Sequence, residues 1–273
     1  MSNLPLTIIA VTYNSRHILD SFLYNLESYR NNLLIIDNGS DDDTVVFLKK
    51  NQIRVLALDK NLGFGQAANI GVAECITPFF CLVNPDCSPG SGLLNKGLEV
   101  LAGNPQSCIV PKKIIQSDNV YSGIQPGYTR LKLFKDILET NYGPSVIVRW
   151  LDNLSKLHDH SWYWPLGVCL IMTKDYFEKI GGFDPNYFMY CEDVDLGKRI
   201  TNAGGSIIAV DENLLHEGRN SSLLAEDKKI MLINQGRLQY ARLNYGRYFT
   251  IILSTLVNVS YALKKQLKGK FRS

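Results

Sequence analysis

The sequence lacks the features typical of secreted, membrane-spanning and nucleic-acid-binding proteins. It has no uninterrupted run of about 18 apolar residues, so we predict no spanning helix. A basic segment followed by an apolar core, as in a secretory signal, is missing from the N-terminus. The net charge of +3 over 273 residues provides no broad positive field for nucleic acid. We therefore expect a cytoplasmic protein that does not bind nucleic acid.

Cysteine pairs with zinc or redox spacing are also missing. No two of the cysteines form a CxxC pair, which speaks against a structural zinc site. Most lie in apolar runs, which favours buried and reduced thiols over disulfides. The six are Cys75, Cys81, Cys87, Cys108, Cys169 and Cys191.

The first hundred residues alternate between strand and helix patterns. Short apolar runs rich in branched residues indicate buried strands, and apolar positions three and four apart indicate helices. This alternation predicts an α/β fold with a mainly parallel sheet. The predicted strands are Leu6–Val11, Asn32–Ile36, Ile53–Leu58 and Phe79–Val83, and the predicted helices are Ser15–Leu26, Asp43–Lys50 and Gln66–Cys75.

The rest of the chain begins with a less regular segment, Gln116–Ser161, rich in Tyr, Gly, Asn and charged residues. We interpret this segment as an insertion or a substrate-facing part of the same domain. Regular patterns then return as strands at Leu166–Thr173 and Ser206–Val210 and helices at Lys174–Ile180, Glu192–Ala203 and Glu226–Tyr245. We predict a catalytic domain over residues 1–218, with halves of about 1–110 and 111–218, and a helical extension over 219–273.

Polar residues follow several predicted strands. Asn84-Pro85-Asp86 ends the apolar run Phe79–Val83, because proline cannot continue a central strand. Thr12, Tyr13 and Asn14 close the first strand, and Asp37 closes the second. The carboxyl ends of parallel strands share one edge, where ligands of open α/β sheets bind. Asp86 is therefore a candidate metal ligand, whereas Asp37 either binds a base or ribose or only builds a turn.

A loop with two glycines precedes the predicted helix Gln66–Cys75. It reads Asn61-Leu62-Gly63-Phe64-Gly65 and lacks both the Rossmann spacing and the lysine of a P-loop. Its backbone and the helix N-terminus could approach a phosphate, or the small residues could serve close packing alone.

Two further groups could carry chemistry. Glu192 and Asp193 open a predicted helix after an aromatic, apolar run. Acids in a first helical turn often only complement the helix dipole, but beside an apolar run they could also serve as a general base. His216 lies just beyond the strand Ser206–Val210. Together with Asp86 it could complete a divalent metal site, which suits Mn²⁺ better than Mg²⁺.

Taken in order, these blocks resemble the family-2 glycosyltransferases of GT-A fold. The likeness is strongest to the bacterial rhamnosyltransferase-like branch of surface-polysaccharide synthesis. Its segments are VTYNS (11–15), IIDNGSDD (35–42), NLGFGQAANIG (61–71), LVNPD (82–86), GGFDPNYFMYCEDVDLGKRI (181–200) and LLHEG (214–218). One departure is Asn84, which stands where the family's Asp-x-Asp motif has its first acid. Another is Trp164–Val168, which replaces a Ser-Gly-Ala-like turn.

The resemblance implies a role for each matching residue. Asp86 and His216 would bind Mn²⁺ or Mg²⁺, and Asp193 would be the general base with Glu192 as its neighbour. The nucleotide of the donor would contact Thr12, Tyr13, Asn14, Asp37, Asn61, Gly63, Asn69 and Asn84.

The implied reaction is inverting transfer of a sugar from a nucleotide diphosphate donor, with dTDP-rhamnose as the best candidate. The implied acceptor is a lipid-linked or growing glycan of an O-antigen or capsule. Transfer of a hexosyl, N-acetylhexosaminyl or galactofuranosyl group from a UDP-sugar is the alternative. A sugar nucleotidyltransferase and a non-catalytic nucleotide-sugar binder are alternatives of other classes. The first of these would need a basic, glycine-rich loop directly after the first strand, which is not present.

The C-terminal segment supports a separate hypothesis. An apolar stretch, Tyr248–Leu263, precedes the basic run Lys264–Arg272. This pattern is typical of a helix lying on an anionic membrane surface, and a peripheral position on the cytoplasmic face would reach a lipid-linked acceptor. Packing on the protein's own domain, or in a homodimer contact, is the alternative.

Overall fold

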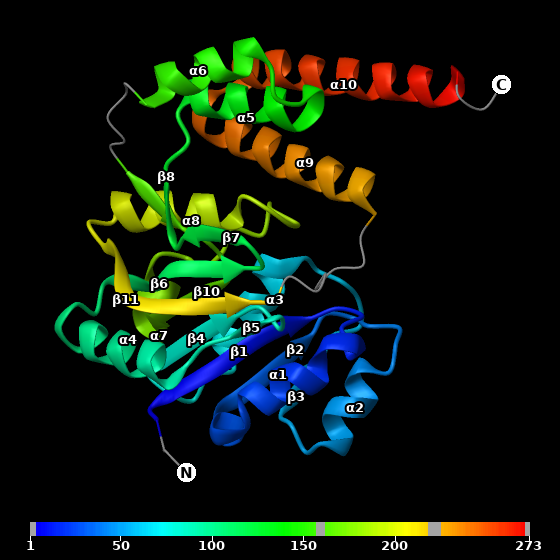
Figure 1. Cartoon of the computed structure of the whole chain (residues 1–273). Coiled ribbons are helices and arrows are strands. Elements are labelled where there is room, and N and C mark those ends of the chain that lie inside the picture. Colours follow the sequence, from blue (N-terminus) through cyan, green and yellow to red (C-terminus); the bar gives the residue numbers. More distant parts are fainter. Residues whose placement is uncertain (1–3, 157–161, 218–224, 271–273) are drawn as a thin grey trace. The chain divides into compact units, whose positions relative to one another are not determined.

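The computed structural model describes residues 4–156, 162–217 and 225–270, and the chain divides into two compact units. The first takes in the described residues of 1–126, 162–188 and 192–224, and the second those of 127–161, 189–191 and 225–273. Figure 1 labels the helices and strands of both units. We describe each unit by itself.

The first unit contains a nine-stranded sheet with the order β3-β2-β1-β4-β10-β6-β11-β5, and β7 pairs with β6. β8 and β9 form a separate two-stranded sheet. The strands of the first half are β1 (Leu6–Thr12), β2 (Leu33–Asp37), β3 (Val55–Ala57), β4 (Phe79–Val83) and β5 (Cys87–Ser88). The later strands are β6 (Ser107–Gln116), β7 (Asn119–Ser122), β8 (Ile124–Pro126), β9 (Tyr163–Pro165), β10 (Cys169–Thr173) and β11 (Ser206–His216).

The predicted mainly parallel α/β sheet is confirmed. β1 runs parallel to β2 and β4, and β6 runs parallel to β11. β10 is antiparallel to both β4 and β6, so it joins the two parallel groups. The sequence pattern could not distinguish this reversed strand, because a strand covered on both faces is apolar whichever way it runs.

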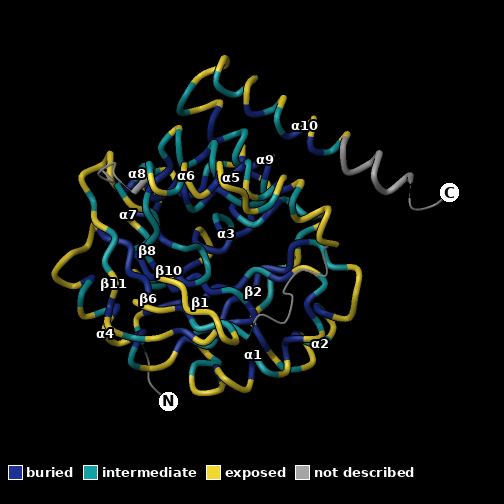
Figure 2. The backbone as a smooth tube through the Cα atoms, turned by 45° about the horizontal axis from the view of Figure 1, so that its top comes forward, coloured by how far each residue is buried: buried dark blue, intermediate teal, exposed yellow. Residues whose placement is uncertain are grey.

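Helices cover both faces of the sheet. α1 (Leu19–Asn25), α2 (Thr44–Lys50) and α4 (Ser91–Gly103) contribute to one buried cluster, and α3 (Phe64–Ala73), α7 (Lys174–Lys179) and α8 (Glu192–Asn202) contribute to the other. Two 3₁₀ turns flank α1, at Arg16–Ile18 and Glu27–Asn32. β1 supplies both clusters, because Ile8 and Ile9 point to opposite sides of a strand. Most residues of β1, β2, β4 and β10 are accordingly buried, and Figure 2 marks buried backbone in dark blue.

The second unit consists of the helices α5 (Arg130–Tyr142), α6 (Val146–Lys156), α9 (Glu226–Tyr245) and α10 (Arg247–Lys270). α5 packs against each of the other three. Inside the unit the side-chain amides of Asn141 and Asn234 donate to each other at 3.0 and 2.9 Å. Because both buried amides are paired, they fix how α5 meets α9 without leaving a polar group unsatisfied.

The interpretation of Gln116–Ser161 as an irregular segment was wrong for residues 130–156, which contain the whole of α5 and α6. The helical pattern is weak because these helices bury only part of their surface, and their partners α9 and α10 lie almost a hundred residues further along the chain. The structure groups α5 and α6 with the C-terminal helices. The predicted division into a catalytic domain over 1–218 and an extension over 219–273 stays a prediction.

Candidate functional site

The ends of β1 and β2 lie side by side, as predicted. Thr12 is paired with Asp37 in the parallel register, and β4 flanks β1 on its other side. The hydroxyl of Thr12 donates to Asp37 Oδ1 at 3.0 Å, and Ser40 donates through its backbone N–H to Oδ2 and through its hydroxyl to Oδ1. Three donors therefore orient a carboxylate that is almost completely buried.

Asn14 and Tyr13 complete this strand end. Asn14 has the positive backbone φ of 51°, and its Oδ1 accepts the N–H of Asp41 at 2.8 Å. This contact ties the end of β1 to the turn after β2, while the ring of Tyr13 stays partly exposed. The turn thus leaves an aromatic side chain partly exposed directly after Thr12, which bonds to Asp37, and these residue types suit a nucleoside. The nucleotide-binding roles of these residues stay predictions.

The glycine loop before α3 is held by the side chain of Asn38, the residue that directly follows Asp37. Asn38 Nδ2 donates to Asn61 Oδ1 and to the carbonyl of Gly63, and Asn38 Oδ1 accepts the N–H of Leu62. Gly63 has a φ of +87°, and a Cβ there would collide with the carbonyl oxygen of Phe188. Only glycine therefore fits where this loop meets the segment before α8.

Asn69 serves a different partner from the one predicted for it. Its Nδ2 donates to the carbonyl of Phe183 at 2.8 Å, and its Oδ1 accepts the N–H of Phe183 at 2.8 Å. Both ends of the amide thus hold the turn that follows α7. A contact between Asn69 and a nucleotide or its sugar stays a prediction.

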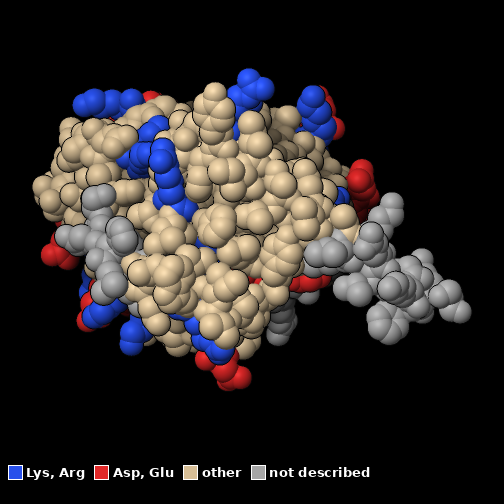
Figure 3. Space-filling model, turned by 90° about the horizontal axis from the view of Figure 1, so that it is seen from above, with Lys and Arg blue, Asp and Glu red and all other residues tan. Residues whose placement is uncertain are grey.

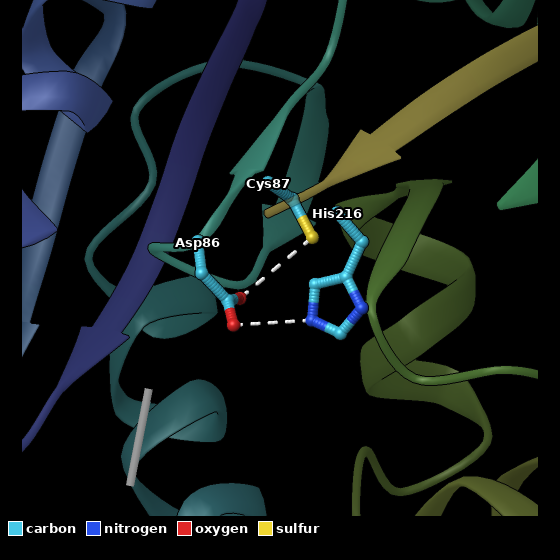
Figure 4. A group of neighbouring side chains, drawn as sticks. All are labelled: Asp86, Cys87 and His216. Carbon is cyan, nitrogen blue, oxygen red and sulfur yellow. Dashed lines mark hydrogen bonds and ion pairs between the residues drawn. The ribbon is translucent and has the colours of Figure 1, made fainter. Parts of the chain in front are cut away.

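Asp86 and His216 meet although 130 residues separate them in the sequence. Asp86 Oδ2 and His216 Nε2 are 3.1 Å apart, and both side chains are largely buried (Figure 4). The predicted strand Ser206–Val210 was too short. β11 continues to His216, with an irregularity between Val210 and Asn213, and its last residue pairs with Cys87 of β5. The β11–β5 pairing thus delivers the imidazole to Asp86.

Cys87 is a third member of this cluster and was not predicted. One donor atom each from Asp86, Cys87 and His216 lie within 4.8 Å of one another, close enough to surround a cation. Burial, followed by the neighbouring Asp86, raises the pKa of the Cys87 thiol far above its usual range. Without a bound cation the thiol is therefore protonated, and a soft sulfur ligand suits Mn²⁺ or Mg²⁺ less well than the carboxylate does. The carboxylate and the imidazole fit a divalent cation such as Mn²⁺.

Asn84 stands beside this cluster and supports it through its backbone. Its N–H donates to the carbonyl of Val168 at 3.0 Å, and its carbonyl accepts the N–H of Cys87 at 3.0 Å. These backbone bonds close the Asn-Pro-Asp turn after β4 and do not involve the side-chain amide of Asn84. The predicted contact of that amide with the donor stays a prediction.

The acidic pair lies at the start of α8. Asp193 Oδ2 accepts the N–H of Gly167 at 3.0 Å, and Oδ1 accepts the N–H of Val194 at 2.9 Å. Gly167 belongs to the segment Trp164–Val168, so that departure from the family pattern touches the predicted base directly. Asp195 instead forms an ion pair with Arg199 at 2.7 Å, which assigns this third acid to structure.

Burial raises the pKa of both acids of the pair, to about 8 for Glu192 and about 6 for Asp193. The charge of Asp193 raises the pKa of Glu192 further, whereas backbone N–H groups moderate the shift of Asp193. Glu192 Oε2 is also buried without a hydrogen-bond partner among the described residues. At neutral pH we expect a neutral Glu192 beside an ionised Asp193, and an ionised carboxylate of raised pKa is suited to accept a proton.

Glu192→Gln is expected to stabilise the fold at neutral pH. Between the pKa of a free glutamate and about 8, the unfolded chain ionises while the folded Glu192 keeps its proton. Wild-type stability therefore falls as the pH rises through that window, by an amount on the order of a few kcal/mol. The Tm of Glu192→Gln should exceed that of the wild type at pH near 8 and match it at pH near 4. Equal Tm values at both pH values would contradict the buried, protonated acid.

Hydrogen bonds in the described part of the chain thus join Thr12 with Asp37 and Asp86 with His216, while Asp193 bonds to Gly167 and Val194. The sequence interpretation missed Asn38, Cys87 and Gly167. Two of these directly follow a predicted site residue, which is the only signal that could have indicated them.

Sequence comparison links the chain to known proteins along most of its length. The profile described as "Glycosyl transferase family 2" matches residues 7–166, and one described as "N-terminal domain of galactosyltransferase" matches residues 149–219. The N-acetylglucosaminyl-diphospho-decaprenol L-rhamnosyltransferase of Mycobacterium tuberculosis is 27% identical over 240 residues, which are 80% of this chain and 77% of that protein. Glycosyltransferase AglE of Haloferax volcanii is 25% identical over 94% of this chain and 82% of its own length.

Solved structures share the fold at low sequence identity. GalNAc-T7, crystallised with UDP, GalNAc and Mn²⁺, aligns with a TM-score of 0.57 and 14% identity over 78% of this chain, which spans 44% of that structure. TarS of S. aureus in complex with UDP-GlcNAc aligns with a TM-score of 0.54 and 14% identity, over 88% of this chain and 74% of that one. These alignments confirm the predicted GT-A fold.

Proposed function

The chain belongs to glycosyl transferase family 2, and from that premise we propose that it is an inverting, metal-dependent transferase of surface-polysaccharide synthesis. The observation that carries the proposal is the contact between Asp86 and His216 at the sheet edge where β1 and β2 also end. A divalent cation held by this pair would neutralise the diphosphate of a nucleotide sugar and the charge that develops as it leaves.

The donor that we propose is dTDP-rhamnose, and the acceptor is a lipid-linked glycan. The rhamnosyl group and the lipid carrier are taken from the name of the mycobacterial relative, an N-acetylglucosaminyl-diphospho-decaprenol L-rhamnosyltransferase. The dTDP part of the donor rests on the family resemblance of the sequence. Thr12, Asp37 and the ring of Tyr13 would receive the pyrimidine nucleoside, with the turn at Asn14 closing over it. A lipid-linked acceptor would place the reaction at the cytoplasmic face of a membrane.

In this proposal the acceptor hydroxyl gives its proton to Asp193. The hydroxyl oxygen attacks the anomeric carbon, the bond from that carbon to the diphosphate oxygen breaks, and the electron pair leaves with the diphosphate. A single displacement inverts the anomeric centre and needs one base and no covalent nucleophile. The N–H groups of Gly167 and Val194 orient the Asp193 carboxylate for this transfer.

A UDP-sugar is the alternative donor. TarS was crystallised with UDP-GlcNAc and GalNAc-T7 with UDP, and both share the fold of this chain. Asp37 could bind either pyrimidine, because thymine and uracil present the same hydrogen-bonding edge.

A panel of nucleotide sugars tests the proposal. We expect dTDP-rhamnose with Mn²⁺ to raise the Tm by several degrees, because ligand at about a hundredfold its Kd stabilises a protein by about 2.7 kcal/mol. Transfer to a lipid-linked acceptor is then measured with the donor that gives the largest shift. A larger shift with a UDP-sugar would favour the alternative donor. Donor binding without turnover on any such acceptor would instead indicate a non-catalytic binder.

A further inference from the structure

The last part of the chain has an unusual balance of charge. From Lys228 to Ser273 it contains ten lysines and arginines and no aspartate or glutamate. Between Arg247 and Lys264 no residue is charged at all. The second compact unit therefore carries an apolar helical segment with basic residues at both ends.

The described part of α10 is apolar on two sides. One side is buried in the unit through residues that include Leu253 and Val257. The other side carries Tyr248, Ile252 and Val259, spaced by four and seven residues and therefore on one face of the helix. Tyr248 is 87% exposed and Ile252 55% exposed, so the described part of the unit covers neither. An apolar side of a helix that its own unit leaves exposed favours a second apolar partner.

α6 adds a second exposed apolar face in the same unit. Val146, Ile147 and Trp150 share one side of this helix, and Trp150 is 60% exposed. Arg149 lies exposed among them. Figure 1 shows α6 and α10 on the same side of the unit, and α5 packs against both. We call the exposed residues Val146, Ile147, Trp150, Tyr248, Ile252 and Val259 the α6–α10 face.

Basic residues lie in both helices of the α6–α10 face. Arg149 of α6 and Arg247 at the start of α10 are exposed. Figure 3, which views the molecule from above, shows lysine and arginine side chains among uncharged ones. Such a surface is complementary to an anionic bilayer. Its apolar residues match the acyl chains, and its basic residues match the phosphate groups. Tryptophan and tyrosine are also the residues that favour the boundary between these layers.

We propose that the α6–α10 face is a docking surface for an anionic phospholipid bilayer. α6 and α10 would lie in the plane of the membrane, with Trp150, Tyr248 and Ile252 between the acyl chains and arginines such as Arg149 and Arg247 at the phosphates. In the described part of the chain no helix is long and apolar enough to cross a bilayer, so the contact would be interfacial. A second copy of the chain fits less well, because α10 contains no acidic residue and α6 contains one, Asp152, so two such faces would bring an excess of cations together.

This inference rests on the proposed function, because a lipid-linked acceptor is the reason for membrane contact. Its test measures vesicle binding and does not require sugar transfer. Sedimentation of the full chain with vesicles of phosphatidylcholine and phosphatidylglycerol is compared with sedimentation with phosphatidylcholine alone. We expect binding to the anionic vesicles only, weakened by high salt. Replacing Arg247 with glutamine should weaken it roughly fivefold at low salt, because one basic residue near an anionic surface contributes about that factor.

The double variant Trp150→Ser/Ile252→Ser should lose binding by roughly a hundredfold, from about tenfold for each large apolar side chain. Ile76→Ser is the matched control, because Ile76 is 88% exposed in the other unit and should not affect binding. Unchanged vesicle binding by the double variant would overturn the proposal. A second result would also overturn the proposal. In it, light scattering shows a dimer of the wild type and a monomer of the double variant, and neither protein binds vesicles.

Transfer to a water-soluble acceptor analogue separates this inference from the proposed function. The double variant should retain transfer to this analogue, because neither substituted residue is among those proposed to bind the donor or to act as the general base. Vesicle binding without any sugar transfer would support the docking surface and contradict the proposed transferase activity.

Discussion

Asp86→Asn is expected to lower kcat/KM by about three orders of magnitude. The substitution keeps the shape of the side chain and a polar contact to His216, but it removes the negative charge that would hold a divalent cation. Stabilisation of the leaving diphosphate by such a cation contributes several kcal/mol, and about 1.4 kcal/mol corresponds to a factor of ten. Steady-state transfer at several Mn²⁺ concentrations measures the effect. The variant should also need more Mn²⁺ for half-maximal activity.

Asp211→Asn is the control for this variant. Asp211 lies on the same strand as His216, but its side chain is 84% exposed and pairs with Lys112 on the surface. It should transfer sugar at the wild-type rate. If Asp86→Asn kept wild-type kcat/KM and an unchanged Mn²⁺ requirement, the metal site would have to lie elsewhere.

Asp193→Asn is expected to lower kcat by about 10² to 10⁴-fold, the usual contribution of a positioned general base. Asparagine can still accept the N–H of Gly167 through its amide oxygen, so the segment that carries Gly167 should stay in place. It cannot accept a proton from the acceptor hydroxyl. KM for the donor should change little, because Asp193 is not among the residues proposed to bind it.

The pH profile distinguishes a base from a merely structural acid. Since Asp193 must be ionised, wild-type kcat/KM should fall as the pH decreases through about 6, and the residual activity of Asp193→Asn should not show this fall. Asp195→Asn is the matched control from the same helix turn. It loses the ion pair with Arg199 and some stability, but the folded protein should retain both its rate and the acidic limb. An acidic limb that persists in Asp193→Asn would remove Asp193 as the base.

Local patterns were sufficient to predict most of the first unit. Phe79–Val83 was predicted as a strand with its observed bounds. A short, continuously apolar run indicates a buried strand, and the Asn-Pro that follows it ends the strand. In the second unit, the helix Glu226–Tyr245 was also predicted with its observed bounds. The end of β11 was missed because Asp211 and Glu212 interrupt the apolar pattern, and pairing with β6 and β5 carries the strand past them to His216.

The family and the fold class were therefore readable from the chain alone, whereas the assembly of the candidate site was not. Family, fold class and the roles suggested for Asp86, Asp193 and His216 depend on residue types in a given order, which a sequence contains. Tertiary structure alone placed His216 against Asp86, added Cys87 beside them, and set Gly167 on the carboxylate of Asp193. It alone also joined α5 and α6 to α9 and α10. Each of these contacts crosses tens of residues or more, or depends on how a strand is paired, and no local pattern of side chains records such partners.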